Sequence, residues 1–395
     1  TLPNSLYFTH IGVEDGLCQN TVCCILQDHL GFIWLGTKDG LTRYDGYRFR
    51  VFKHDAADPM SIGNNFIRVL YEDADGLIWI GTNVGVYIYN PETENFRKFD
   101  MATERGDVIS REVSSIKCDS SGDLWIGVNW QGVFRYDRRD ESLELYEPVP
   151  GDTTSLSLVH VWDLCFDGDG NLWVGSQNGG LDRYDRETDR FVLHRLKGLS
   201  DVSRIVLDKQ NQLLLGTMKD GLFSFNPYMG TCQPLLLDSG HKDLFVRAIF
   251  VRNSREVVVG TENGIYIYDC VTRKTRHVNQ ELGNPYSLSC KAVYSIYCDK
   301  EGALWIGTYF GGVNYLPPSS SLIFDKFYPI GHSDRLSGKA VREFVRDENG
   351  IIWIGTEDQG LNRFDPVSGK FTHYNSRNSG LSCDNVHGLC VDGDR

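Results

Sequence analysis

One variable position in a repeated strand carries the residues of this sequence that are best suited to binding a charged ligand. A Val or Ile recurs in eight similar stretches, and the residue after it changes from copy to copy while the structural positions of the repeat stay uniform. The eight copies place at this variable position Cys23, Arg68, Ser114, Trp162, Ser203, Arg247, Tyr294 and Arg342. Arginine binds carboxylates and sulfates through paired hydrogen bonds, and aromatic rings pack against apolar faces such as those of sugars. In a chain of formal net charge −13, this pattern predicts a local basic pocket.

More candidate residues lie beside this position and in nearby loops. Asp163 and Arg204 follow it by one residue in their copies. Arg111 and Lys291 stand where two of the strands begin, and aromatic residues replace small polar ones in the loops that hold Trp130 and Tyr309. A simpler interpretation stays open, in which the channel side chains are solvated and the loop aromatics cap neighbouring structure. The ligand-binding hypothesis names Arg68, Arg111, Trp130, Trp162, Asp163, Arg204, Arg247, Lys291, Tyr294 and Tyr309.

Catalytic and cofactor chemistry finds little support in the sequence. It contains none of the short motifs that cradle nucleotide phosphates, activate a serine or hold a catalytic zinc. The stretch DGDGN at 167–171 begins like a calcium loop but lacks that loop's later Gly and Glu. We therefore expect no cofactor, no metal and no catalytic residue. The acidic net charge argues against nucleic acid as a partner.

The residues above sit on a strand that belongs to a repeat. A Trp-Ile-Gly-Thr-like segment recurs eight times with its glycine 41 to 48 residues from the next, at Gly36, Gly81, Gly127, Gly175, Gly216, Gly260, Gly307 and Gly355. In two copies the tryptophan gives way to Leu214 and Val258. This period and the alternating strands predict four-stranded antiparallel blades of a β-propeller. An aspartate eight residues before the glycine, replaced once by Arg252, indicates a hairpin turn.

The blade count follows from where the repeat breaks. The seventh copy runs into Pro317-Pro318 and three serines in place of a fourth strand, and an N-terminal strand within Leu6–Ile11 could supply the missing one. We predict an all-β chain with a seven-bladed propeller at 1–317, a linker at 318–321 and the first blades of a second propeller at 322–395. A single eight-bladed ring is the alternative, and it leaves the Pro-Pro break unexplained.

The consensus N-x-V-x-x-I-x-x-D-x-x-G-x-[IL]-W-[IVL]-G-T resembles the two-component-regulator propeller repeat. The opening HIGVEDGLCQNTVCCILQDHLGFIWLGTKDGLTRYDGYRF is similar to the start of the periplasmic sensor region of hybrid two-component systems of gut bacteria. The resemblance covers essentially the whole chain. It implies two seven-bladed propellers, a membrane-proximal β-sandwich, a transmembrane helix, and a histidine kinase joined to a response regulator that controls polysaccharide utilisation.

The resemblance also implies a function and partners. We expect a non-catalytic periplasmic domain that recognises a glycan-derived oligosaccharide, acidic if the basic pocket binds it, within a parent protein that acts as a homodimer. The second propeller and the sandwich of that parent would be further partners. Two alternatives remain. A propeller glycosidase or lyase would need two carboxylates facing each other across the channel mouth, for which Asp163 and Glu112 are the candidates. A protein-binding scaffold would suit Trp130, Tyr309 and Phe310.

Overall fold

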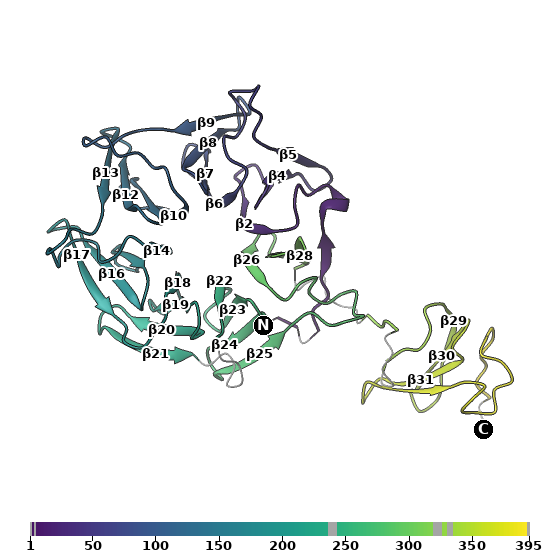
Figure 1. The fold of residues 1–395 in the computed structure, drawn as a ribbon. Helices are drawn as coiled ribbons and strands as arrows, with labels where there is room; N and C mark the ends of the chain where they lie inside the picture. Colours follow the sequence, from purple (N-terminus) through teal and green to yellow (C-terminus); the bar gives the residue numbers. More distant parts are fainter. Residues whose placement is uncertain (1, 4, 236–242, 319–325, 330–334, 393–395) are drawn as a thin grey trace. The chain divides into compact units, whose positions relative to one another are not determined.

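The computed structural model describes residues 2–3, 5–235, 243–318, 326–329 and 335–392. The chain divides into two compact units: Thr1–Gln280 with Ser287–Ser321, and Glu281–Tyr286 with Leu322–Arg395. Their described strands form eight four-stranded antiparallel sheets, seven in the first unit and one in the second (Figure 1). The predicted all-β propeller class is confirmed. Most of the predicted linker, residues 319–321, lies outside the described residues, so the predicted domain boundaries stay a prediction.

Each blade of the first unit is a meander of consecutive strands, numbered outward from the channel. The first four blades are β2 (Val22–Gln27), β3 (Ile33–Thr37), β4 (Gly40–Tyr44), β5 (Phe49–Phe52); β6 (Ile67–Glu72), β7 (Ile78–Thr82), β8 (Val86–Asn90), β9 (Asn95–Phe99); β10 (Val113–Cys118), β11 (Leu124–Val128), β12 (Gly132–Asp137), β13 (Ser142–Tyr146); and β14 (Asp163–Phe166), β15 (Leu172–Gly175), β16 (Gly180–Asp185), β17 (Arg190–Arg195).

The remaining blades follow the same plan. They are β18 (Val202–Leu207), β19 (Leu213–Thr217), β20 (Leu222–Asn226), β21 (Thr231–Leu235); β22 (Val246–Val251), β23 (Glu256–Thr261), β24 (Gly264–Asp269), β25 (Lys274–Val278); β26 (Val293–Cys298), β27 (Leu304–Thr308), β28 (Val313–Leu316) with the N-terminal β1 (Thr9–Ile11); and, in the second unit, β29 (Val341–Arg346), β30 (Ile352–Thr356), β31 (Leu361–Asp365), β32 (Lys370–Tyr374). A short 3₁₀ helix, η1 (Val13–Asp15), follows β1. No helix among the described residues has the length and hydropathy that crossing a membrane requires.

The N-terminal strand closes the ring. Thr9 pairs with Tyr315 and Ile11 with Val313, so β1 supplies the fourth strand of the seventh blade, and β2 lies beside β26 (Figure 1). The predicted closure is confirmed for Thr9–Ile11, whereas the preceding residues of the expected strand are not in β-structure. A ring fastened in this way leaves no open sheet edge at the seam.

A recurring hydrogen bond inside the blades joins the tryptophan of the second strand to the repeated aspartate. Its length is 2.8–3.0 Å in six blades, from the indole Nε1 to Oδ2, in the pairs Trp34–Asp28, Trp79–Asp73, Trp125–Asp119, Trp173–Asp167, Trp305–Asp299 and Trp353–Asp347. The other carboxylate oxygen accepts backbone N–H groups of the hairpin turn, as Asp299 does from Glu301 and Ala303. The sequence predicted the turn bonds but not the indole bond.

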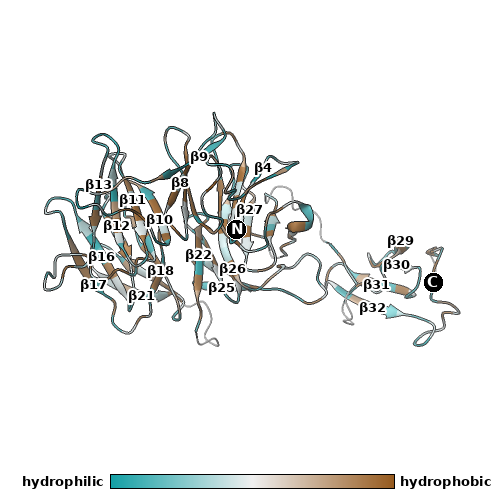
Figure 2. Cartoon of the chain, turned by 45° about the horizontal axis from the view of Figure 1, so that its top comes forward, coloured by the Kyte–Doolittle hydropathy of each residue, from teal (hydrophilic) through white to brown (hydrophobic). Residues whose placement is uncertain are grey.

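The next blade packs against the flat face of the fixed indole ring. Trp34 contacts Tyr89 of the second blade with ring centroids 4.9 Å apart, and Trp305 of the seventh blade contacts Tyr44 of the first at 5.9 Å. Figure 2 shows the apolar residues concentrated along the strands that make these contacts. The predicted burial of the tryptophan is confirmed in the first unit, for Trp34, Trp79, Trp125, Trp173 and Trp305, whereas Trp353 of the second unit is only partly buried.

The repeated glycine marks the closest approach of adjacent blades. A Cβ on Gly81 would lie 2.6 Å from a methyl carbon of Val113 in the next blade, and one on Gly307 would lie 2.7 Å from the carbonyl oxygen of Val22, across the seam of the ring. The repeated Val or Ile is fully buried in all seven blades of the first unit, as predicted. In the second unit Val341 is 45% exposed.

Two matched aspartates isolate the contribution of the indole bond. Asp208, whose copy has Leu214 in place of tryptophan, makes the same turn bonds as Asp299, to the N–H groups two and four residues on. We expect Asp299→Ala to lower the free energy of unfolding by about 2 kcal/mol more than Asp208→Ala does, because it also strands the indole N–H of Trp305. Urea unfolding of both variants measures the difference, and equal losses would contradict this account.

A buried carboxyl in the fourth blade makes stability depend on pH. Asp182 is fully buried, its Oδ2 accepts the Ser157 hydroxyl at 2.5 Å, and burial raises its pKa to about 6. Because this value exceeds that of the unfolded chain, about 4, folding favours the protonated form. The stabilisation is complete below pH about 4 and is lost as the pH rises through 6.

We therefore expect Asp182→Asn to be more stable than the natural protein at pH 8 by about 1–2 kcal/mol, with a much smaller gain at pH 4.5. Asparagine already occupies the same place in β28 and β31, where Asn314 and Asn362 bond to Ser289 and Ser337. Thermal unfolding at both pH values, with the exposed Asp140→Asn as a control, measures the effect. A gain of equal size at both pH values would show that ionisation of Asp182 is not its cause.

Candidate ligand-binding site

A β-bulge in the first strand of the blades positions the variable residues. The pairing of first and second strands skips one residue after Val22, Ile67, Val113, Val202, Val246 and Val293. The skipped residue is in each case the one at the variable position, and a residue in a bulge is left out of the ladder while its side chain is re-aimed. In the fourth blade Trp162 precedes β14 and donates its N–H to the carbonyl of Gly175 at 2.9 Å. The bulge therefore turns the variable residues toward the channel.

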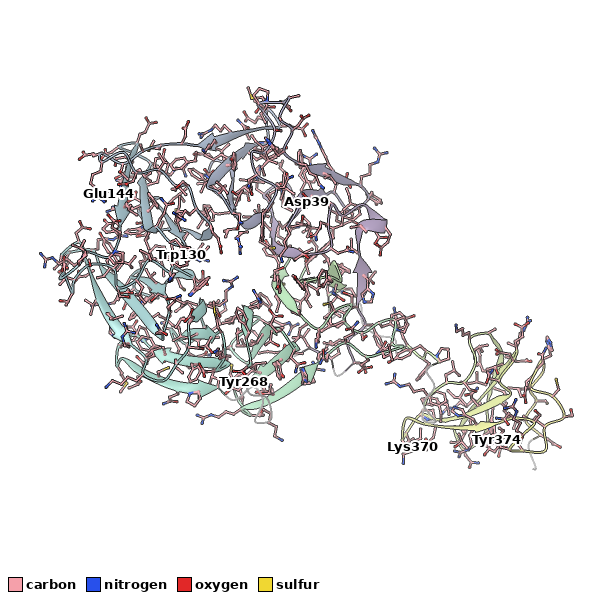
Figure 3. The ribbon with its side chains drawn as sticks, in the orientation of Figure 1. Asp39, Trp130, Glu144, Tyr268, Lys370 and Tyr374 are labelled. Carbon is pink, nitrogen blue, oxygen red and sulfur yellow. The ribbon has the colours of Figure 1, made fainter. Side chains whose placement is uncertain are left out.

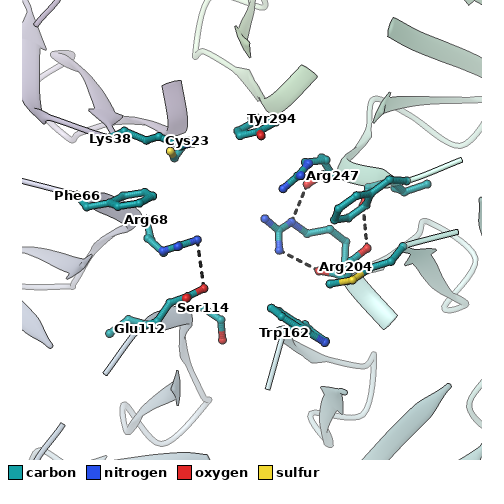
Figure 4. A pocket seen from close by; sticks show the side chains of 15 residues that line it. Cys23, Lys38, Phe66, Arg68, Glu112, Ser114, Trp162, Arg204, Arg247 and Tyr294 are labelled. Atoms are coloured by element: carbon teal, nitrogen blue, oxygen red, sulfur yellow. Dashed lines mark hydrogen bonds and ion pairs between the residues drawn. The ribbon is translucent and has the colours of Figure 1, made fainter. Parts of the chain in front are cut away.

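These residues converge on one cavity of about 380 Å³ in the first unit (Figure 4). All seven blades contribute their variable residue to its lining: Cys23, Arg68, Ser114, Trp162, Ser203, Arg247 and Tyr294. Neighbouring positions add Lys38, Phe66, Glu112, Arg204, Met218 and Phe245, among others. The cavity wall thus carries four cationic side chains, four aromatic rings and one carboxylate.

Two of the three arginines in the cavity are already paired with carboxylates. Arg68 lies 3.1 Å from Oε1 of Glu112 in the next blade, and its Nε donates to Oδ1 of Asn83 at 2.8 Å. Arg247 is ion-paired through Nε with Glu262 of its own blade, and its guanidinium packs 4.3 Å from the ring centroid of Tyr294. These pairs hold both side chains in place and offset their charge.

Arg204 is held by backbone carbonyl oxygens instead. Its Nε donates to the carbonyl of Arg247 at 2.7 Å and its Nη1 to that of Ser203 at 2.9 Å. Among the described residues, no carboxylate oxygen lies within ion-pairing distance of its guanidinium. Figure 4 shows the tip of Arg204 pointing into the cavity, toward Arg68 on the opposite wall.

The other wall residues are rigid or neutral. Trp162 donates its indole N–H to Oδ2 of Asp201 at 3.1 Å, which fixes the ring beside Arg204 (Figure 4). The Lys38 ammonium lies 4.4 Å from the ring centroid of Tyr309. Burial raises the pKa of the Cys23 thiol to about 11, although the cations of the cavity lower it, so this thiol is uncharged at neutral pH.

The structure brings five of the ten predicted site residues together around this cavity. They are Arg68, Trp162, Arg204, Arg247 and Tyr294. Tyr309 lies just behind the wall, with its ring 5.2 Å from that of Tyr294. That any of them binds a ligand stays a prediction.

The other predicted residues do not line the cavity. The carboxylate of Asp163 is buried and accepts the N–H of Leu164 at 2.9 Å and that of Ile205, in the next blade, at 3.0 Å. Arg111 and Lys291 are exposed at the entrances of β10 and β26, and their carbonyls accept backbone N–H groups. Trp130 is 58% exposed in the loop after β11, with its ring 3.9 Å from that of His160 (Figure 3).

Several cavity residues were missed because two further variable positions went unused. One is the residue before the repeated Val or Ile, which supplies Phe66, Phe245 and Glu112, the last considered from the sequence only as a catalytic carboxylate. The other lies two residues after the glycine, at Lys38 and Met218. Backbone hydrogen bonds join the two positions within a blade, as from Glu262 N–H to the Phe245 carbonyl at 3.2 Å. Variation at all three positions together would have identified the wall from the sequence.

Of the two carboxylates that the glycosidase hypothesis named, only Glu112 lines the cavity. A glycosidase needs a second carboxylate facing Glu112, whereas the carboxylate of Asp163 is bonded to backbone N–H groups between two blades. Among the described residues no group of three or more His, Cys, Asp or Glu side chains is placed to hold a metal ion.

Comparisons with known proteins show which family the repeat resembles. The family described as two component regulator propeller matches residues 16–39, 61–84, 155–178, 287–310 and 335–358. A histidine kinase of Formosa agariphila is 44% identical over 48 residues, which are 12% of this chain and 4% of that protein.

Solved structures are similar to this chain over a longer part of its length. The extracellular domain of the putative hybrid two-component system BT3049 of B. thetaiotaomicron is 27% identical with a TM-score of 0.78, over 94% of this chain and 49% of that one. That of BT4673 is 22% identical with a TM-score of 0.68, over 96% and 49%. A streptogramin B lyase, at 14% identity and a TM-score of 0.57 over 79% of this chain and 97% of that one, shares the propeller fold. The chain thus spans about half the length of the two extracellular domains.

The neutral thiol in the cavity gives a direct probe of the site. We expect iodoacetamide at pH 8 to alkylate Cys23 more than about 10-fold more slowly than the exposed Cys383, because the thiolate is the reacting species. Peptide mass spectrometry over a time course measures both rates in one sample. Equal rates would show that the cavity is wetter than the structure has it.

Proposed function

We propose that this chain, which carries two-component-regulator propeller repeats, is the extracytoplasmic ligand-binding region of a hybrid two-component sensor and recognises a glycan-derived oligosaccharide. The observation that carries the proposal is the cavity to which every blade of the ring contributes its variable residue. The Val or Ile that precedes each of these residues and the repeated glycine are kept in every blade, so packing does not require the variation. The volume of the cavity suits a ligand of one or two sugar units.

The chemistry of the wall favours a polar ligand with sugar-like faces. Trp162, Phe66, Phe245 and Tyr294 offer rings for stacking, and the arginines and Glu112 offer donors and acceptors for hydroxyl groups. Hydrogen bonds to fixed partners hold Trp162 and Arg204 in place before a ligand arrives. Such preorganisation lowers the entropy that binding costs.

Similarity to extracellular domains of hybrid two-component systems supports the sensor role. In that role the chain lies in the periplasm, in a longer homodimeric protein with a second propeller and a membrane-proximal sandwich. Ligand binding is passed to a histidine kinase and response regulator that control polysaccharide utilisation. This chain does no chemistry in the process. A protein-binding propeller is the competing hypothesis, because Trp130 and Phe310 are exposed.

Two tryptophans, one on the cavity wall and one in a loop outside it, separate these hypotheses. We expect Trp162→Ala to weaken binding of a cognate oligosaccharide about 10-fold, through loss of the stacking surface, with the fold unchanged. Trp130→Ala, outside the cavity wall, should change the affinity less than about 2-fold. Calorimetry with a panel of plant and host oligosaccharides, followed by product analysis of the same mixtures, gives both measurements.

Three results would count against the proposal. Cleavage of a panel member would favour the glycosidase or lyase hypothesis. A larger loss with Trp130→Ala than with Trp162→Ala would move the site from the cavity to the loop. Absence of binding across the panel would favour a scaffold.

A further inference from the structure

We infer that the ligand presents one acidic group, a carboxylate or a sulfate, which Arg204 binds at the centre of the cavity while the rest of the ligand is uncharged. The inference rests on the proposed function and specifies its ligand class. The sequence alone treated Arg68, Arg204 and Arg247 as equivalent cations. The structure distinguishes them by their partners.

The positive charges on the cavity wall differ in how far they are already offset by carboxylates. Arg68 faces Glu112 at 3.1 Å and Arg247 is bound to Glu262, so each of these cations is offset by a carboxylate. Arg204 has no such partner among the described residues, and its nearest polar contacts are two carbonyl oxygens. The uncompensated guanidinium in the cavity is therefore that of Arg204.

Arg204 also has free donors in a suitable geometry. A guanidinium has five N–H groups, and the two carbonyl contacts use one on Nε and one on Nη1. Both terminal nitrogens thus retain an N–H, and in the described part of the chain no acceptor is bonded to Nη2. A carboxylate or sulfate that approaches the end of the group can accept two parallel hydrogen bonds.

The flanking carboxylates limit the number of acidic groups. Glu112 lines the cavity and Glu262 is paired with Arg247, so a second acidic group on the ligand would meet a like charge wherever it approached Arg68 or Arg247. Lys38 is the other cation without a carboxylate partner in the described residues, and its ammonium lies over the ring of Tyr309. The carboxylate of Glu112 can instead accept hydroxyl groups of an uncharged sugar unit.

The stacking surface lies beside the anchor. Trp162, whose ring is fixed by its bond to Asp201, lines the cavity next to Arg204 (Figure 4). A sugar ring stacked on Trp162 would place an acidic substituent within reach of Arg204. The geometry is that of an acidic sugar unit followed by neutral ones.

Matched oligosaccharides test the number of charges. The probes are aldotriouronic acid against xylotriose, 3-sulfogalactotriose against galactotriose, and trigalacturonate as a ligand with three acids. Calorimetry on the full chain should show one singly acidic probe binding about 10- to 100-fold more tightly than its neutral partner and than trigalacturonate.

Arginine variants test the anchor. Arg204→Gln should remove that preference for the acidic probe. Arg342→Gln, at the variable position of the second unit and paired with Glu357, is the control and should leave binding as it was. Glu262→Gln frees Arg247 from its carboxylate and should raise the affinity for trigalacturonate about 10-fold. Circular dichroism and thermal unfolding confirm that each variant is folded.

The outcomes separate the inference from the function beneath it. Tight binding of a neutral probe, or of trigalacturonate by the natural protein, overturns the single-acid inference and leaves the oligosaccharide sensor standing. Equal losses of affinity with Arg204→Gln and Arg342→Gln would overturn the role of Arg204 in binding the acidic group. Failure of every probe to bind overturns both the inference and the proposed function.

Discussion

The bond between the indole of each second-strand tryptophan and the repeated aspartate organises this structure. The carboxylate closes the hairpin turn through backbone N–H groups and fixes the tryptophan plane at the same time. A plane fixed in this way gives the next blade a flat apolar surface to pack on. The glycine beside the tryptophan lets the first strand of that blade approach within van der Waals contact. The same contacts therefore recur around the ring and set the rotation of each blade relative to the next. The central channel results from this regular arrangement.

Where the recurring bond is absent, other contacts take its place. The sixth blade has Arg252 at the aspartate position, where it pairs with Glu256, and the same carboxylate accepts the backbone N–H of Leu2 at the start of the chain. Tyr266 and Tyr268 fill the space beside Leu214, which replaces a tryptophan in the fifth blade. The departures from the repeat thus lie where the N-terminal segment is anchored and where aromatic residues of a neighbouring blade supply the missing volume.

A scaffold that is fixed by a few positions leaves others free to vary. The bulge after the repeated Val or Ile places one such position in the channel, and two nearby positions add to the wall in some of the blades. The result is an asymmetric site on a nearly symmetric ring: arginines come from the second, fifth and sixth blades, the indole from the fourth and a phenol from the seventh. An acidic protein can hold a basic cavity in this way, because its cations are gathered by geometry rather than by overall composition.

The sequence by itself determined the repeat, the all-β class, the ring closed by β1, and the variable position that faces the channel. These features depend on periodicity along the chain, which is visible without coordinates. Apolar residues alternate within the strands, and the repeated glycine recurs once in every blade. Only the tertiary structure decided which side chains meet across blades. Asp163 was expected at the channel mouth but bonds to Ile205 in the next blade, and Arg68 is offset by Glu112 while Arg204 is not. Such partners lie about forty residues apart, and their distance is set by blade rotation and by the bulge, which no local pattern encodes.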